Sequence, residues 1–294
     1  MGFRIKELSH EQGMRMGELA HSLKMPLSNL SAINAGYRSV SLPLLTRIAK
    51  RLGCTVPELF EEEKPASAFR NVRLEQAVRQ LEASNPFGIE KGWVHRLNFA
   101  LERHFKSVRD GETPYGAKRP MDADPYTQLI DGFNKASVDH VVIGMVGINY
   151  YARSAAESFL TKDFDLLLKP SFENLSKAVR VFHNLGYETM TTEGVVGEKE
   201  LRAVLQKKKT LLAVDHYGVT FEVLFKVSGF SFRQMTEDAA VFRAGETLVR
   251  VGKLSKLLAS KRAANRPKDR LFLKRYEILL KEMPQKPSGG TTLF

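Results

Sequence analysis

Cysteine and tryptophan are nearly absent from this chain of 294 residues, which contains one of each. The single cysteine, Cys54, excludes a disulfide within the chain and is typical of a reducing compartment, so we expect a cytoplasmic location. No run of about 18 apolar residues occurs, and therefore no membrane-spanning helix is expected. The first residues carry scattered charges and lack the apolar core of a signal peptide.

Acidic residues are the minority among the charges, with 33 Asp and Glu against 45 Lys and Arg, which gives a formal net charge of +12 at pH 7. This balance favours a polyanionic partner such as nucleic acid or nucleotide phosphates, although many basic proteins bind neither. The apolar fraction of 43% is sufficient for a packed core. The length allows two domains.

Changes in composition divide the chain into four segments. Residues 1–63 show short helical patterns between polar turns and end in an acidic run, which predicts a small all-α domain. Residues 64–121 combine helical periodicity with turn-forming residues and are expected to be a helical connector and linker. Residues 122–284 form the next segment, and residues 285–294 are expected to be a flexible tail.

Helical and strand patterns alternate in residues 122–284. Helices are expected at residues 125–137, 149–157 and 171–186, strands at 140–145 and 162–169, and a hairpin at 210–225. A long basic helix is expected from about Leu254. This order predicts an α/β (α+β) domain with a small mixed sheet, and hence a multidomain protein.

Three short amphipathic helices are predicted near the N-terminus. Their apolar positions are Leu19, Ala20 and Leu23 in the first, Leu30 and Ile33 in the second, and Leu45, Ile48, Ala49 and Leu52 in the third. Pro26 suits the first turn of the second helix, and Gly36 stands where its C-cap is expected. This order indicates a helix-turn-helix whose recognition helix runs from Leu27 to Asn34.

The same residues resemble the Cro/C1-type (Xre-like) repressor family over about residues 3–60. The family pattern is met by Leu19-Ala20, Met25, Ile33, Gly36 and Leu59-Phe60. Two positions depart from it. Met16 stands where the family commonly has Gln, and Asn34 stands where it commonly has Glu.

A helix-turn-helix of this kind implies DNA as a partner. The expected DNA-binding residues are Arg15, Leu27, Ser28, Asn29, Ser31, Tyr37 and Arg38. Short polar side chains near the start of the recognition helix would meet base edges, and the arginines and tyrosine would meet phosphates. One such domain covers little DNA, so a homodimer reading two half-sites is the usual solution. The alternative is a small helical domain that contacts other proteins.

Two carboxylates, Asp163 and Asp165, precede the apolar run of the strand expected at residues 162–169. Residues two apart on a strand point to the same face, with Cα atoms roughly 6.5 Å apart. Such a pair can hold a divalent cation, and Mg²⁺ is commonly bound by carboxylate oxygens together with substrate phosphates. The alternative is that both side chains form the solvated end of a strand.

Two further features favour the metal-binding interpretation. Gly144 and Gly147 lie between an expected strand and an expected helix, where backbone N–H groups can meet phosphates. Glu222 stands alone inside an apolar strand, where an unpaired charge is costly. Asp215 is a rival third carboxylate, but it flanks the expected hairpin turn, where Asp is common, so we prefer Glu222.

Together these residues resemble the polymerase-β-like nucleotidyltransferase superfamily, and in particular the AbiEii-like and antitoxin-like bacterial nucleotidyltransferases. The resemblance covers about residues 126–280. It rests on "IGMVGINYYA", "LTKDFDLLL", "FEVLFKVSG" and "LSKLLASKRAANRPKDRLFLKRYEIL". Met145 departs from the family, which usually has a second Gly or a Ser there, and the segment from this turn to Asp163 is a few residues longer than usual.

The resemblance implies transfer of a nucleoside monophosphate from an NTP to an unknown acceptor protein or RNA, with Mg²⁺ or Mn²⁺ as cofactor. The implied metal-binding and catalytic residues are Asp163, Asp165 and Glu222. The implied nucleotide-binding residues are Gly144, Met145, Lys261, Arg262 and Lys268. Considered alone, the basic run that holds the last three favours a solvated helix face over a nucleotide site.

Two functional hypotheses follow from the sequence. The first is an enzyme that transfers a nucleoside monophosphate and uses its DNA-binding domain for regulation or location. The second is a transcriptional regulator whose transferase-like domain is inactive and senses nucleotide or binds a partner. Since such transferases recur in toxin–antitoxin and phage-defence loci, a role there is implied by analogy.

Overall fold

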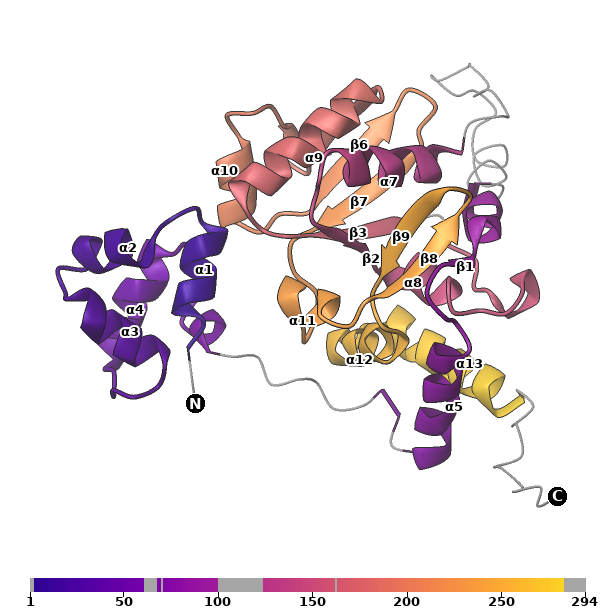
Figure 1. Ribbon diagram of the computed structural model, residues 1–294, viewed down its shortest axis with the longest axis horizontal. Helices are drawn as coiled ribbons and strands as arrows, with labels where there is room; N and C mark the ends of the chain where they lie inside the picture. Colours follow the sequence, from indigo (N-terminus) through magenta and orange to yellow (C-terminus); the bar gives the residue numbers. More distant parts are fainter. Residues whose placement is uncertain (1–2, 61–67, 70, 100–123, 162, 283–294) are drawn as a thin grey trace.

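The structure of the protein is a computed structural model, which describes residues 3–60, 68–69, 71–99, 124–161 and 163–282. The tail expected at residues 285–294 and the linker expected before residue 122 lie outside these residues. Figure 1 shows a small helical bundle at the N-terminus beside a larger α/β part. None of the described helices is long and apolar enough to cross a membrane.

The N-terminal bundle is built from short helices around one apolar core. Its elements are α1 (Ile5–Glu11), α2 (Met16–Ser22), α3 (Leu27–Asn34), α4 (Leu42–Arg51) and the 3₁₀ turn η1 (Pro57–Leu59). The core contains all of the apolar positions that the sequence predicted, and α3 has the predicted bounds. Gly36 has φ of +74° and ends α3 as predicted, with its N–H donating to the Ile33 carbonyl at 2.9 Å.

The two ends of the bundle are joined to each other. Phe3 and Phe60 form an isolated β-bridge, and their ring centroids are 5.0 Å apart. Asn34 at the end of α3 also holds the start of α1, because its side-chain oxygen accepts from the Lys6 N–H at 2.9 Å. Asn34, which stands where the family commonly has Glu, therefore links the end of α3 to the start of α1.

The α/β part contains a mixed sheet of nine strands. They are β1 (Ile89–Glu90), β2 (His140–Val142), β3 (Phe164–Leu168), β4 (Tyr187–Thr191), β5 (Gly194–Val195), β6 (Leu211–Asp215), β7 (Thr220–Leu224), β8 (Ala240–Ala244) and β9 (Thr247–Val251). Their order across the sheet is β1-β8-β9-β2-β3-β7-β6-β4-β5. β3 is central, antiparallel to β2 and parallel to β7. The mixed sheet is confirmed, but it is not small, because β1, β4, β5 and the β8–β9 hairpin were not predicted.

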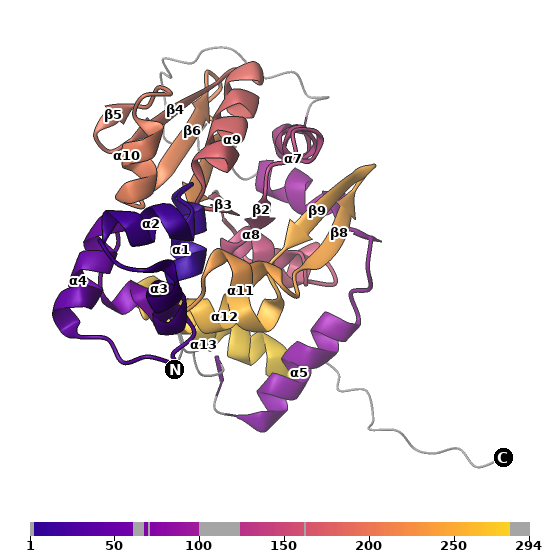
Figure 2. The ribbon, with the colours of Figure 1, turned by 60° about the vertical axis from the view of Figure 1, so that its left-hand side comes forward.

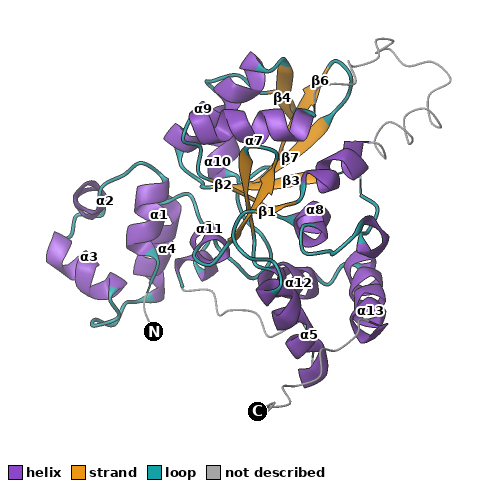
Figure 3. Ribbon diagram, turned by 45° about the vertical axis from the view of Figure 1, so that its right-hand side comes forward, coloured by secondary structure: helices purple, strands orange, loops and turns teal. Residues whose placement is uncertain are grey.

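Helices cover the sheet in two groups, as Figure 3 shows. They are α7 (Pro125–Lys135), α8 (Gly144–Asn149), η2 (Ala155–Glu157), α9 (Phe172–Asn184), α10 (Leu201–Gln206), α11 (Phe232–Thr236), α12 (Leu254–Ala264) and α13 (Pro267–Glu282). One group contains α7, α9 and α10, and the other contains α8, α12 and α13. The helix expected at residues 149–157 lies earlier than predicted, since α8 begins at Gly144 and a turn follows it.

The long C-terminal helix predicted from Leu254 is two helices. Asn265 adopts the left-handed conformation with φ of +50°, and Pro267 begins α13, so the break is made by two residues that suit it. The consequence is that the basic residues on either side of the break do not follow one helical face.

The segment before the sheet contributes to the core of the α/β part. It contains α5 (Val72–Ala83), strand β1 and a helix at residues 92–99. Phe69, Leu74 and Val78 belong to the same apolar cluster as the central strands, and α5 packs against α12 and α13. The described part of this segment is mostly helical, but it also adds strand β1 to the sheet, and it is packed as part of the α/β fold.

The helical bundle contacts the α/β part through α10, which lies beside it in Figure 2. Lys208, just after α10, pairs with Glu58 of η1 at 2.9 Å. Thr55 donates to the same Glu58 carboxylate from its backbone N–H at 2.8 Å. These hydrogen bonds outweigh the effect of burial and lower the pKa of Glu58 to about 2.

Candidate functional site

A cleft of about 540 Å³ lies where β3 begins, β2 ends and α12 meets α13. It contains most of the residues that the sequence assigned to catalysis and nucleotide binding. Those that line it are Gly144, Met145, Asp163, Asp165, Glu222, Lys261 and Lys268. Arg262 is not among the lining residues.

The two strand carboxylates are placed side by side by the parallel pairing of β3 with β7. Asp165 is in register with Glu222, and the two side chains lie within hydrogen-bonding reach. The other four side chains of β3 are buried, and Asp165 alone is partly exposed, toward the cleft. Asp163 lies two residues earlier and is exposed. Within the described residues, no group of three or more His, Cys, Asp or Glu side chains could hold a metal ion as it stands.

Gly144 is required by the position of Asp165. Its φ is +67°, and a Cβ built there would lie 1.7 Å from Asp165 Oδ2. The Ile143 N–H also donates to the Asp165 carbonyl at 3.1 Å. The glycine turn and the carboxylate are therefore in direct contact. Met145, the next residue, lines the cleft but leaves the stated volume open, so its thioether does not fill the site.

The cations of the cleft are organised by a buried carboxylate that the sequence did not indicate. Asp269 is 1% exposed, and its oxygens lie 3.5 Å from Lys261 Nζ and 2.6 Å from Arg266 Nε. Lys261 Nζ also lies 5.1 Å from the centre of the Phe272 ring. Arg266 also lines the cleft. The sequence pattern does not indicate it, because one continuous helix through this region favours Arg262.

The electrostatics of the cleft favour bound positive charge. Burial, with the neighbouring Glu222 and Asp163 carboxylates, raises the pKa of Asp165 to about 8. Burial lowers the pKa of Lys261, while the nearby Asp269 and Asp165 carboxylates oppose this change. A cation bound between the carboxylates would oppose this rise in the pKa of Asp165.

Other polar side chains line the same cleft and carried no signal in the sequence. They are Thr161, Thr210, Lys226, Ser228 and Ser260. The rival carboxylate Asp215 is absent from the lining. Its Oδ1 accepts from the Val219 N–H at 2.7 Å, which assigns it to the turn between β6 and β7. Of the two candidates for the third carboxylate, Glu222 lines the cleft and is in register with Asp165, whereas Asp215 does not line it.

The predicted DNA-facing residues are mostly exposed on the bundle. Leu27, Ser28 and Ser31 project from α3, and 48% of the Leu27 surface is accessible. Tyr37 is 89% exposed beyond the end of α3. In Figure 1, α3 lies on the side of the bundle away from the α/β part, whereas α1 faces it.

Two of these residues are bound to each other. The Arg38 guanidinium donates to Asn29 Oδ1 at 2.5 Å, so the two side chains form one unit beside the recognition helix. Arg15 precedes α2 and is exposed, and its backbone N–H donates to Glu18 at 3.0 Å. Met16, where the family commonly has Gln, packs partly buried against the core of the bundle.

Comparison with known proteins identifies one family in the chain. The model of the Cro/C1-type HTH DNA-binding domain matches residues 4–65. No curated protein and no solved structure matches the chain. The matched residues include the described α1 to η1 and the exposed face of α3. Residues 4–65 are therefore a Cro/C1-type helix-turn-helix DNA-binding domain.

Proposed function

We propose that this DNA-binding protein is also a nucleotidyltransferase, which transfers a nucleoside monophosphate from an NTP to an acceptor protein or RNA. The observation that carries the proposal is the in-register pair of Asp165 and Glu222, directly beneath the Gly144 turn and facing cationic side chains across one cleft. Opposite charges arranged on two walls suit a ligand that brings both phosphates and a metal ion.

The carboxylates fit Mg²⁺ or Mn²⁺. Both are hard donors, and Mg²⁺ is usually held by one or two carboxylates plus phosphate oxygens, so Asp165 and Glu222 suffice without a third close ligand. A bound metal would stabilise charge on the attacking and leaving oxygens. Asp163, exposed at the mouth, would complete the set once the nucleotide is in place.

The remaining cleft residues bind and orient the nucleotide in this proposal. Lys261, Arg266 and Lys268 line the same cleft as the carboxylates and would neutralise the triphosphate. Asp269 holds Lys261 and Arg266 through ion pairs, so both cations are positioned before the nucleotide arrives. Arg262 is not part of this set, because it does not line the cleft.

A second candidate is a regulator that binds nucleotide without transferring it. It is favoured by the exposed position of Asp163 and by the absence, within the described residues, of a group of three or more His, Cys, Asp or Glu side chains that could hold a metal ion. In both cases we propose that a homodimer places two helix-turn-helix domains on the DNA, and that the setting is a toxin–antitoxin or phage-defence system.

Label transfer separates the two candidates. The full-length chain is incubated with each labelled NTP and Mg²⁺ or Mn²⁺, alone and with cellular RNA or protein. Transfer that is lost in the double variant Asp163→Ala, Asp165→Ala, but kept in Glu188→Gln, supports the enzyme. Glu188 is an exposed carboxylate of β4 outside the cleft and is the matched control. Nucleotide binding without transfer supports the regulator, and transfer by the double variant contradicts the proposed site.

A further inference from the structure

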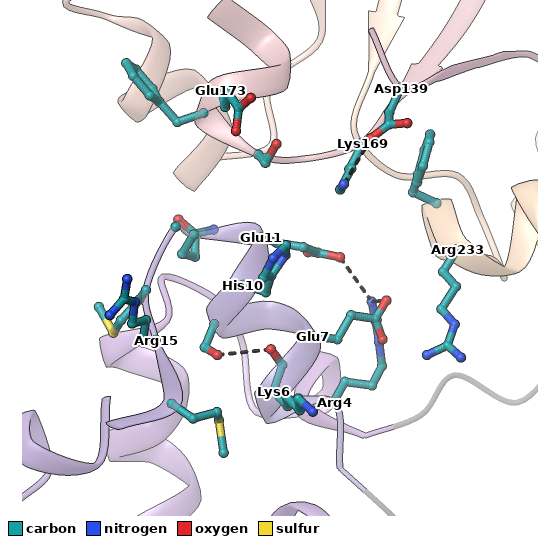
Figure 4. A pocket seen from close by; sticks show the side chains of 18 of the residues that line it. Arg4, Lys6, Glu7, His10, Glu11, Arg15, Asp139, Lys169, Glu173 and Arg233 are labelled. Atoms are coloured by element: carbon teal, nitrogen blue, oxygen red, sulfur yellow. Dashed lines mark hydrogen bonds and ion pairs between the residues drawn. The ribbon is translucent and has the colours of Figure 1, made fainter. Parts of the chain in front are cut away.

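A second cavity, of about 1280 Å³, lies between the helical bundle and the α/β part, and we call it the interdomain groove. Figure 4 shows α1 on one side and the segments around Asp139, Lys169, Glu173 and Arg233 on the other. Sites for small molecules usually enclose roughly 300–1,000 Å³. The groove is larger, so it suits part of a macromolecular chain.

The groove has more positive than negative side chains. Its cations are Arg4, Lys6, Arg15, Lys169, Arg202, Arg233 and Arg250, and its acids are Glu7, Glu11, Asp139 and Glu173. Each acid already forms an ion pair. The pairs are Glu7–Arg4 at 3.1 Å, Glu11–Arg4 at 3.8 Å, Asp139–Lys169 at 3.0 Å and Glu173–Lys177 at 2.8 Å. Glu7 and Glu11 share Arg4, so the four acids are paired with three cations of the protein.

Three arginines of the α/β part remain available to a ligand. Arg202, Arg233 and Arg250 are exposed, and none forms an ion pair with a described residue. The Arg202 guanidinium lies 4.2 Å from the centre of the Phe172 ring, which fixes its plane and leaves its edge free to donate. In Figure 4 the Arg233 side chain extends from α11 toward α1. The guanidinium groups of these three arginines can therefore donate hydrogen bonds to a ligand in the interdomain groove.

The groove borders the DNA-binding domain at the turn before α2 and at the C-terminal end of α3, whereas the rest of α3 lies on the side of the bundle away from the α/β part. Arg15, which is expected to contact phosphate, and Asn34, the last residue of α3, both line the groove. Exposed arginines that follow an established DNA-binding element suit a phosphodiester backbone, because Arg pairs with phosphate oxygens through two parallel N–H groups.

We propose that the interdomain groove holds the phosphate backbone of the DNA duplex to which the helix-turn-helix is bound, with Arg202, Arg233 and Arg250 as the contacts. The α/β part then enlarges the DNA footprint beyond the half-site of one domain. The inference rests on the DNA-binding domain alone and is independent of transferase activity. An acidic peptide is the competing occupant, and it would not depend on the length of a duplex.

The salt dependence of DNA binding tests the proposal. Affinity of the full-length chain is measured by fluorescence anisotropy at several salt concentrations, from about 50 to 200 mM, where the logarithmic slope changes by about 0.9 per phosphate contact. Two duplexes are used, one of about 12 base pairs, little more than one helical turn, and one of about 36. The triple variant Arg202→Ala, Arg233→Ala, Arg250→Ala should reduce the slope by up to about 2.7 on the long duplex. It should leave the slope on the short duplex unchanged.

Two control variants make the result specific. Alanine at Arg73, Arg180 and Arg275, which are exposed arginines outside the groove, removes the same net charge. Lysine at the three groove positions keeps the charge and should retain most of the slope. An equal loss of slope in the control triple, or no loss in the groove triple on the long duplex, overturns the proposal. Arg38→Ala should weaken binding to both duplexes alike, because Arg38 belongs to the helix-turn-helix and does not line the groove.

Discussion

Replacing Gly144 by Ala examines the geometry on which the cleft depends. The backbone there has φ of +67°, and the added Cβ would lie 1.7 Å from Asp165 Oδ2. Gly186 is a matched control, because its φ is +80° and a Cβ there would meet no atom within 4 Å. Both substitutions strain the backbone, and only the first displaces a carboxylate.

The magnitudes separate the two variants. An Ala in the left-handed conformation costs roughly 1–2 kcal/mol, which applies to both positions. Moving the half-buried Asp165 carboxyl away from Glu222 adds the loss of a hydrogen-bonded partner, about 1–3 kcal/mol. Gly144→Ala should therefore destabilise the protein by about 1–3 kcal/mol more than Gly186→Ala. In a domain of this size that difference lowers Tm by about 2–12 °C, at about 2–4 °C per kcal/mol.

Urea unfolding and thermal unfolding, followed by circular dichroism, measure this difference. The nucleotide binding that we propose should be impaired in Gly144→Ala and kept in Gly186→Ala, since only the first variant disturbs the carboxylate pair. Equal stabilities of the two variants would refute the reasoning, because Asp165 would then not lie over the glycine.

Three other predictions follow from the charges. Asp165→Asn should abolish a decline in stability between pH 3.8 and about 8, which arises because the unfolded chain loses this proton at lower pH than the folded chain; denaturant midpoints measured across this range check it. Lys208→Met should raise the pKa of Glu58 from about 2 toward 4.5, which reduces the stabilisation that this carboxylate gives above pH 4.5 and that is lost as the pH falls toward about 2. Carboxyl NMR titration measures the change, and an unmoved pKa contradicts the ion pair. Arg38→Ala should weaken binding to all DNA sequences and lower the salt slope by about 0.9, and equal affinity would exclude Arg38 from phosphate contact.

Local signals explain which parts of the fold could be predicted. The bounds of α3 follow from Pro26 before it and Gly36 after it, and the structure has these bounds. The strand β3 follows from the apolar run Leu166–Leu168 that comes after Asp165, and all three of these side chains are buried. In each case neighbouring residues alone contain the information.

The composition of the cleft depends on contacts between distant residues. The two-residue spacing of Asp163 and Asp165 predicts that they lie on one face of a strand. It does not determine that β3 pairs in parallel with β7, which places Glu222 beside Asp165. The preference for Glu222 rested on the cost of an unpaired charge inside an apolar strand. That cost is visible in the sequence, whereas the strand order is not.

The cations of the cleft were predicted less well than the carboxylates, because the break between α12 and α13 was overlooked. Asn265 and Pro267 turn the chain, which places Arg266 at the cleft and leaves Arg262 out of the lining. Continuing one helix through this point favours Arg262, whereas the structure places Arg266 at the cleft. An Asn followed closely by Pro was the available signal.

The sheet ends in very short strands on both sides, since β1 and β5 contain two residues each. Edge strands of this length offer few unpaired backbone amides and carbonyls, so a strand from another molecule could form few hydrogen bonds with them. Edge-to-edge joining of copies is thereby discouraged within the described sheet. Two copies meeting on DNA would have to recognise each other through side chains on helices and loops.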